Sequence, residues 1–183
     1  MYLALAAIVL IGLYAVFTYN SLVKARQMKE EAWSGIDVQL KRRADLIPNL
    51  IETVKGYAAH EKSTFEEVVS LRNQAQAVPA GDVEGRAKAE GLLGQAVGKL
   101  FALAEAYPDL KANQNFVELQ RSLETLESEI QMSRRYYNGA ARELNVKVES
   151  FPSNLIAGQF GFSKAPYFEI TNEADRAVPT VKF

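Results

Sequence analysis

Residues 115–145, NFVELQRSLETLESEIQMSRRYYNGAARELN, decide the fold because their apolar residues keep a helical spacing along the whole stretch. The spacing alternates between three and four residues, which predicts one long helix with a continuous, coiled-coil-like apolar seam. Asn115 and Glu118 resemble a capping box, so we expect this helix to occupy about residues 114–149. The seam comprises Phe116, Leu119, Leu123, Leu126, Ile130, Ser133, Tyr137, Ala140 and Leu144.

Three further segments show the same periodicity, and we expect helices at about 20–44, 45–77 and 82–106. We expect a break between the first two, with Asp45 as N-cap and Pro48 at the third helical position. The alternative is one continuous helix with a kink at Pro48. Pro79 and Gly81 end the second segment, and Asp82 caps the third. Four long amphipathic segments with short connections predict an all-α fold, an antiparallel four-helix bundle over residues 20–149.

The N-terminal residues 2–17, YLALAAIVLIGLYAVF, contain no charge, and Thr18 and Tyr19 extend the uncharged run. A helix of this length spans about 27 Å, close to the ~30 Å hydrocarbon core of a bilayer. A cleaved signal peptide fits poorly because no positive segment precedes the run and no small-residue cleavage site follows it. A buried core helix would show a polar stripe, and none is present. We therefore predict that residues 1–19 form an uncleaved transmembrane anchor.

The orientation of this anchor follows from the charges that flank it. Lys24, Arg26 and Lys29 follow the apolar run, whereas only the terminal amine precedes it. The positive-inside rule then predicts a single-pass protein of the cell membrane, with its N-terminus outside and its helical domain in the cytoplasm.

Residues 150–183 differ in composition from the helical segments, with several prolines, glycines and aromatic residues. We expect Ser153 to cap a short helix that runs through Phe160, and the whole segment to pack as a tail on the end of the bundle. In an up-and-down bundle this end faces the membrane. Five aromatic residues either plug the bundle end or contact the membrane interface; they are Phe151, Phe160, Phe162, Tyr167 and Phe168.

Composition argues against several kinds of chemistry. The net charge is −1, which gives no general reason to bind nucleic acid, and the chain has no cysteine to form a disulfide or a thiolate ligand. His60 is the only histidine, so neither a di-iron bundle nor a His-Glu-x-x-His zinc site can be built. Residues 94–99, GQAVGK, fail the phosphate-loop pattern in spacing and in the residue after the lysine. We expect no catalytic residue, cofactor or metal site.

Two arginine pairs remain as candidate contact residues. The first interpretation is that they are solvated and paired with nearby acids such as Asp45 or Glu129. The second is that they bind an acidic partner or lipid headgroups. The candidate residues for contact with a protein partner or lipid are Arg42, Arg43, Arg134, Arg135, Phe160 and Phe162.

Five ordered motifs resemble the LemA family over nearly the whole chain. They are YNSLV (19–23), WSGIDVQLKRRADLIPNLIETVKGYAAHE (33–61), YPDLKANQNFVELQRSLE (107–124), SRRYYNGAARELN (133–145) and FPSNLIAGQFGF (151–162). The resemblance implies a bacterial protein with an outer N-terminus, one membrane span and a cytoplasmic helical bundle. It implies no catalytic residues, and it links the chain to membrane organisation and to the quality control of membrane proteins.

The leading functional hypothesis is a membrane-anchored, non-enzymatic interaction or scaffold module. The alternatives are a membrane-shaping or lipid-contacting protein, and an unrecognised enzyme with a carboxylate or arginine site in the bundle. The identity of a protein partner and self-association into a homo-oligomer are left open by the sequence.

Overall fold

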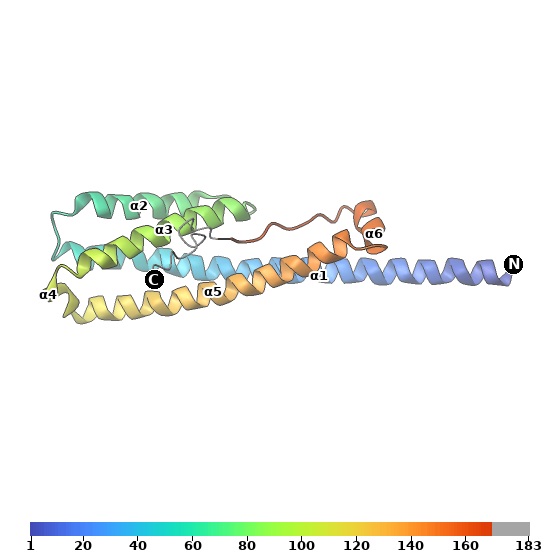
Figure 1. Cartoon of the computed structure of the whole chain (residues 1–183), viewed down its shortest axis with the longest axis horizontal. Helices are drawn as coiled ribbons and strands as arrows, with labels where there is room; N and C mark the ends of the chain where they lie inside the picture. Colours follow the sequence, from blue (N-terminus) through green and yellow to red (C-terminus); the bar gives the residue numbers. More distant parts are fainter. Residues whose placement is uncertain (170–183) are drawn as a thin grey trace, which may run out of the picture. The chain divides into compact units, whose positions relative to one another are not determined.

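The computed structural model describes residues 1–169, and within them the chain is helical with no strand (Figure 1). This confirms the all-α prediction. The helices are α1 (Tyr2–Lys55), α2 (Lys62–Ala77), α3 (Val83–Ala104), α4 (Pro108–Lys111), α5 (Gln114–Glu149) and α6 (Ser153–Gln159). Residues 170–183, the last part of the expected tail, lie outside the described residues.

The described chain divides into two compact units. The first unit contains residues 1–36 and 132–167, and the second contains residues 37–131 together with Phe168 and Glu169. The helices α1 and α5 contribute to both units, because α1 continues past residue 36 and α5 begins before residue 132.

The helix α1 does not break at Asp45, so the predicted boundary there is wrong and the alternative of one continuous helix is correct. Pro48 lacks an N–H, and the carbonyl of Ala44 therefore has no intrahelical donor. Arg72 of α2 supplies the missing donor, with its Nε 2.7 Å from the Ala44 oxygen. The chain reverses instead at residues 56–61, and α2 begins at Lys62.

The second unit is a helical bundle built from the later part of α1, from α2 and α3, and from the first part of α5. As predicted, Asp82 caps α3, since its Oδ1 accepts a hydrogen bond from Gly85 N at 2.8 Å. The cap of α5 is Asn113 and not Asn115, because the Asn113 Oδ1 accepts from Phe116 N at 3.1 Å. The fully buried part of the core includes Ile47, Leu50, Val54, Val68, Leu93, Leu100 and Leu110.

The first unit is built on an antiparallel pairing of α1 with the later part of α5. Lys147 Nζ lies 2.9 Å from Ser21 Oγ, and the rings of Trp33 and Tyr137 meet edge to face with centroids 5.4 Å apart. Small residues at the contact allow the two helices to approach closely. The buried alanines of this pair are Ala25, Ala32, Ala140 and Ala141.

The helix α6 follows α5 after a short turn with a cis peptide bond before Pro152. Ser153 does not cap α6, contrary to prediction; it is the first helical residue, and its Oγ lies 2.7 Å from the Lys147 carbonyl oxygen. Its hydroxyl thus satisfies a carbonyl at the end of α5. Gly161, at φ 72°, ends α6, and Phe162 N donates to the Ala157 carbonyl in a Schellman-type bond of 2.9 Å.

The chain after α6 returns along the α1–α5 pair of the first unit. Asn145 holds this segment at Ala165 through two hydrogen bonds, a donor bond of 2.9 Å and an acceptor bond of 2.7 Å. The Tyr137 hydroxyl donates to the Pro166 carbonyl at 2.9 Å. The described part of the tail therefore packs along two helices of this unit.

Candidate functional site

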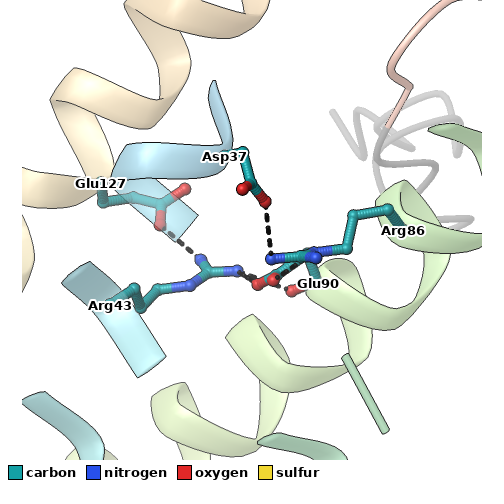
Figure 2. A network of polar contacts seen from close by, with 5 residues as sticks. All are labelled: Asp37, Arg43, Arg86, Glu90 and Glu127. Carbon is teal, nitrogen blue, oxygen red and sulfur yellow. Dashed lines mark hydrogen bonds and ion pairs between the residues drawn. The ribbon is translucent and has the colours of Figure 1, made fainter. Parts of the chain in front are cut away.

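The most unusual polar feature of the second unit is a buried network of charged side chains (Figure 2). Glu90 of α3 is only 2% exposed, and its carboxylate lies between two guanidinium groups. Arg43 of α1 binds one carboxylate oxygen at 2.5 Å, and Arg86, one turn before Glu90, binds the other at 3.0 Å. Glu127 pairs with Arg43 at 2.9 Å and Asp37 pairs with Arg86 at 3.3 Å, which completes the network.

This network connects α1, α3 and α5, because each helix contributes charged side chains that form ion pairs with another helix of the three. An isolated buried carboxylate costs several kcal/mol in desolvation, so the position of Glu90 depends on both arginines. Arg43 also donates from Nη2 to the Glu90 carbonyl at 3.0 Å. The Arg43 Nε is buried without a hydrogen-bond partner within residues 1–169. The network therefore fixes the mutual register of α1, α3 and α5 within this unit.

The arrangement is poorly suited to acid–base chemistry. Each oxygen of Glu90 is paired with a guanidinium group, so this carboxylate is engaged in structural ion pairs. His60 is exposed in the connection between α1 and α2, away from any helix interior. Within residues 1–169, no group of three or more histidine, aspartate or glutamate residues could hold a metal ion.

Beside the network, a groove of about 420 Å³ lies between α1, α3 and α5. Glycines of α3 form part of its lining, and a Cβ added at Gly94 would meet the Arg43 guanidinium at 3.8 Å. Gly98 faces open space, since nothing lies within 4 Å of a Cβ added there. Residues 94–99 lie in the interior of α3, as expected, and the missing side chain at Gly94 leaves room for the Arg43 guanidinium.

In the first unit, an aromatic cluster surrounds the end of the uncharged N-terminal run. The Tyr19 ring contacts Phe160 and Phe162, with centroid distances of 4.9 and 5.8 Å. The Arg26 guanidinium lies 5.1 Å from the centroid of the Phe162 ring. This cluster therefore connects the chain after α6 to the point where the uncharged run of α1 ends.

Two groups in this unit have shifted pKa values. Burial raises the pKa of Tyr137 to about 12, because the phenolate form would be desolvated. The hydrogen bond from Lys164 to Glu149, at 2.7 Å, and the negative charge of that carboxylate raise the pKa of Lys164.

The structure separates the predicted contact residues into different environments. Arg42 is exposed and pairs with Glu129 at 2.8 Å, as the first interpretation expected. Arg43 is only 4% exposed, so the expectation of a solvated side chain is wrong for this residue. Arg134 is partly exposed and interacts with another residue, and Arg135 is exposed.

The five aromatic residues of the tail also differ in their exposure. Phe162 and Phe168 are buried, whereas Phe151, Phe160 and Tyr167 are exposed. The plug interpretation therefore fails for the three exposed rings.

Sequence reasoning missed Arg86 and Glu90, although the register contained a signal. Glu90 lies midway between Val83 and Val97, at seven-residue steps along one helix face. Arg43 similarly follows Leu40 by three residues and precedes Ile47 by four. A charged residue on an apolar stripe indicates a buried ion pair when oppositely charged residues share such stripes elsewhere.

Comparison with known proteins places this architecture in a family. The model of the LemA family matches residues 32–183. The chain belongs to the LemA family. It is similar to the magnetosome protein MamQ 2 of Paramagnetospirillum magneticum, with 26% identity covering 88% of this chain and 68% of the relative.

Two further relatives agree with this assignment. Magnetosome protein MamQ of Magnetospirillum gryphiswaldense is 25% identical over the same shares of the two chains. Protein LemA of Metamycoplasma hominis is 24% identical, covering 82% of this chain and 68% of the relative. In this LemA-family chain, α1 is the one helix within residues 1–169 that is long and apolar enough to cross a membrane.

Proposed function

We propose that this protein is a membrane-anchored, non-catalytic scaffold whose helical bundle holds a protein partner at the membrane. The observation that carries the proposal is the continuity of α1, which runs from exposed apolar residues into a packed core without a break. A partner bound to such a bundle is tethered to the bilayer through the continuous helix α1.

The N-terminal part of α1 supports the anchor. Its large side chains from Tyr2 to Phe17 are exposed and apolar, which is costly in water and favourable in lipid. A bilayer surrounds all of these side chains with apolar lipid. The span is stable there because an α-helix forms all of its backbone hydrogen bonds internally. Lys24, Arg26 and Lys29 then favour a cytoplasmic bundle.

The absence of catalysis is supported by the state of the buried charges. Glu90, the buried carboxylate of the second unit, has both oxygens paired with arginine. Its contacts therefore support the role of a structural ion pair. The names of the magnetosome and LemA relatives describe no reaction.

Cysteine labelling tests the orientation, because the chain contains no native cysteine. We would introduce Tyr2→Cys and Ser128→Cys separately and apply a membrane-impermeant maleimide to right-side-out and inside-out vesicles. We expect labelling of Cys at position 2 only in right-side-out vesicles and at position 128 only in inside-out vesicles. The reverse pattern would contradict the proposed orientation, and labelling of both from one side would contradict the span.

Site-specific photo-crosslinking in native membranes tests the scaffold role. A photoreactive residue replaces one exposed apolar side chain on each of three helices of the bundle, Val38, Val69 and Leu92. Lys41 and Lys88 are polar controls one turn from Val38 and Leu92. We expect at least one apolar position to give a discrete crosslinked protein that the controls do not give. Crosslinks to lipid alone, or equal crosslinks at all five positions, would contradict the proposal; a dimer of this chain would identify the partner as a second copy.

A further inference from the structure

The helix α6 presents an apolar outer face beside the end of the uncharged run of α1. Phe151 is 80% exposed, Leu155 is 63% exposed and Phe160 is 58% exposed. Ala157, on the opposite side of this short helix, is buried in the first unit. Three large and strongly exposed apolar side chains therefore lie within ten residues of sequence, in α6 and close to each of its ends.

The position of this face relative to α1 is fixed inside the first unit. Phe160 contacts Tyr19 with ring centroids 4.9 Å apart, and Phe162 contacts the same ring from the turn after α6. Tyr19 directly precedes the polar residues Asn20 and Ser21, and the first charged side chain of the sequence is Lys24. The α6 face therefore lies at the level where α1 changes from apolar to polar.

The side chains around this level match the chemistry of a bilayer interface. Tyrosine is enriched where membrane spans meet the headgroups, and Tyr19 occupies that place. Lys24 and Arg26 follow within two turns and are exposed, and both suit anionic headgroups. The exposed apolar surface of the span also reaches this level, because Val16, one turn before Tyr19 on the same helix face, is 61% exposed.

We propose that α6 is a second membrane contact, with Phe151, Leu155 and Phe160 inserted in the headgroup–acyl boundary of the leaflet from which α1 emerges. The inference rests on the proposed anchor, since the level of α6 is defined by the end of the span. A short helix held by its contacts with Tyr19 then limits tilt of α1, because the protein meets the leaflet at two points. The Schellman-type turn at Gly161 directs both Phe160 and Phe162 toward Tyr19 and so sets the height of the helix.

Fluorescence quenching in vesicles tests the insertion with the full chain. A single cysteine at Leu155 carries an environment-sensitive nitrobenzoxadiazole label, and the protein is reconstituted in phosphatidylcholine–phosphatidylglycerol vesicles with doxyl-labelled lipids. Met132, an exposed apolar residue on α5 in the same unit, is the matched control. It lies about 22 Å along α5 from Lys147, the residue beside Ser21, and so is expected well outside the headgroup layer.

We expect a blue-shifted label at position 155 and severalfold stronger quenching by headgroup-proximal doxyl groups than at position 132. Phe151→Ser should reduce the quenching at position 155, since it removes the neighbouring insertion point. Equal quenching at positions 155 and 132 would overturn the inference. A blue shift at position 155 without lipid quenching would also overturn it, because another protein or a second copy would then cover the face.

A third label separates this inference from the anchor on which it rests. Cys at Val9, in the middle of the apolar run, should be quenched most strongly by doxyl groups deep in the acyl chains. If position 9 is unquenched, the anchor proposal itself fails. If position 9 is quenched and position 155 behaves like position 132, the anchor stands and only the α6 contact is refuted.

Discussion

Replacing Arg72 should destabilise the protein by an amount that depends on whether residue 48 is proline. The carbonyl of Ala44 is deprived of its helical donor by Pro48, and Ala44 is buried. Arg72 Nε donates to that carbonyl at 2.7 Å from a charged group. Leaving a buried carbonyl unsatisfied costs about 1–3 kcal/mol, and hydrogen bonds to charged groups contribute about 1.5–3 kcal/mol. We therefore expect Arg72→Met to lower the free energy of unfolding by about 2 kcal/mol.

Pro48→Ala supplies the second side of a double-mutant cycle. Alanine restores the N–H that donates to the Ala44 carbonyl and gains up to about 3 kcal/mol of helix propensity over proline. In this background the Arg72 bond is redundant, so Arg72→Met should cost about 0.5 kcal/mol or less, the typical effect of a surface substitution. The coupling energy between positions 48 and 72 should therefore be about 1.5 kcal/mol.

Urea unfolding of the full chain in detergent micelles, followed by far-ultraviolet circular dichroism, measures the four free energies. Arg121→Met is a matched control, because this arginine of α5 is exposed. Its replacement should change the stability by less than about 0.5 kcal/mol in either background. An equal cost of Arg72→Met with proline and with alanine at position 48 would refute the reasoning, since Arg72 would then act through packing or general charge.

Three other perturbations test the remaining features. Arg43→Met should cost about 3 kcal/mol in urea unfolding because the buried Glu90 carboxylate loses one of its two guanidinium partners. The double replacement of Arg43 and Glu90 by Met should recover most of that loss, and equal losses would contradict this. Gly161→Ala should cost about 1–2 kcal/mol in thermal unfolding because residue 161 has a left-handed conformation, while Gly98→Ala in the helix interior should stabilise by about 0.5–1 kcal/mol. Burial raises the pKa of Tyr137 from 10.0 to about 12. The folded state should therefore lose stability as the pH rises from 10 to 12, because the unfolded chain releases the tyrosine proton first. Tyr137→Phe should remove this loss in a pH series of unfolding midpoints.

The periodicity of the sequence predicts the helices whose apolar faces and ends depend on residues close together in the sequence. The residues of the 116–144 seam lie along α5, which extends from Gln114 to Glu149 as expected, and Asp82 caps α3. The start of α5 shows the limit of such reasoning, because Asn113 and Asn115 are equally good caps by residue type. Only the position at which the backbone enters the helix decides between them.

The continuity of α1 required information that no local pattern contains. Pro48 and Asp45 favour a break when the chain is read alone, and the donor that prevents it comes from Arg72 in another helix. The burial of Arg43 was accessible in part, since its register places it on the apolar stripe of α1. The register likewise places Glu90 on one face with Val83 and Val97, but its pairing with Arg43 could not be predicted, because it depends on how α1 and α3 pack together.

Alkaline extraction of membranes that contain the full chain tests the central claim most directly, because it separates integral proteins from proteins held by charge. We expect the chain to remain in the membrane pellet. The variant Ile8→Arg/Ile11→Arg, with two charges at exposed positions of the apolar run, should move to the soluble fraction, since each central arginine costs about 2.5–3.5 kcal/mol in membrane insertion. Release of the unaltered chain, or retention of the double-arginine variant, would contradict the account of α1 as a membrane span.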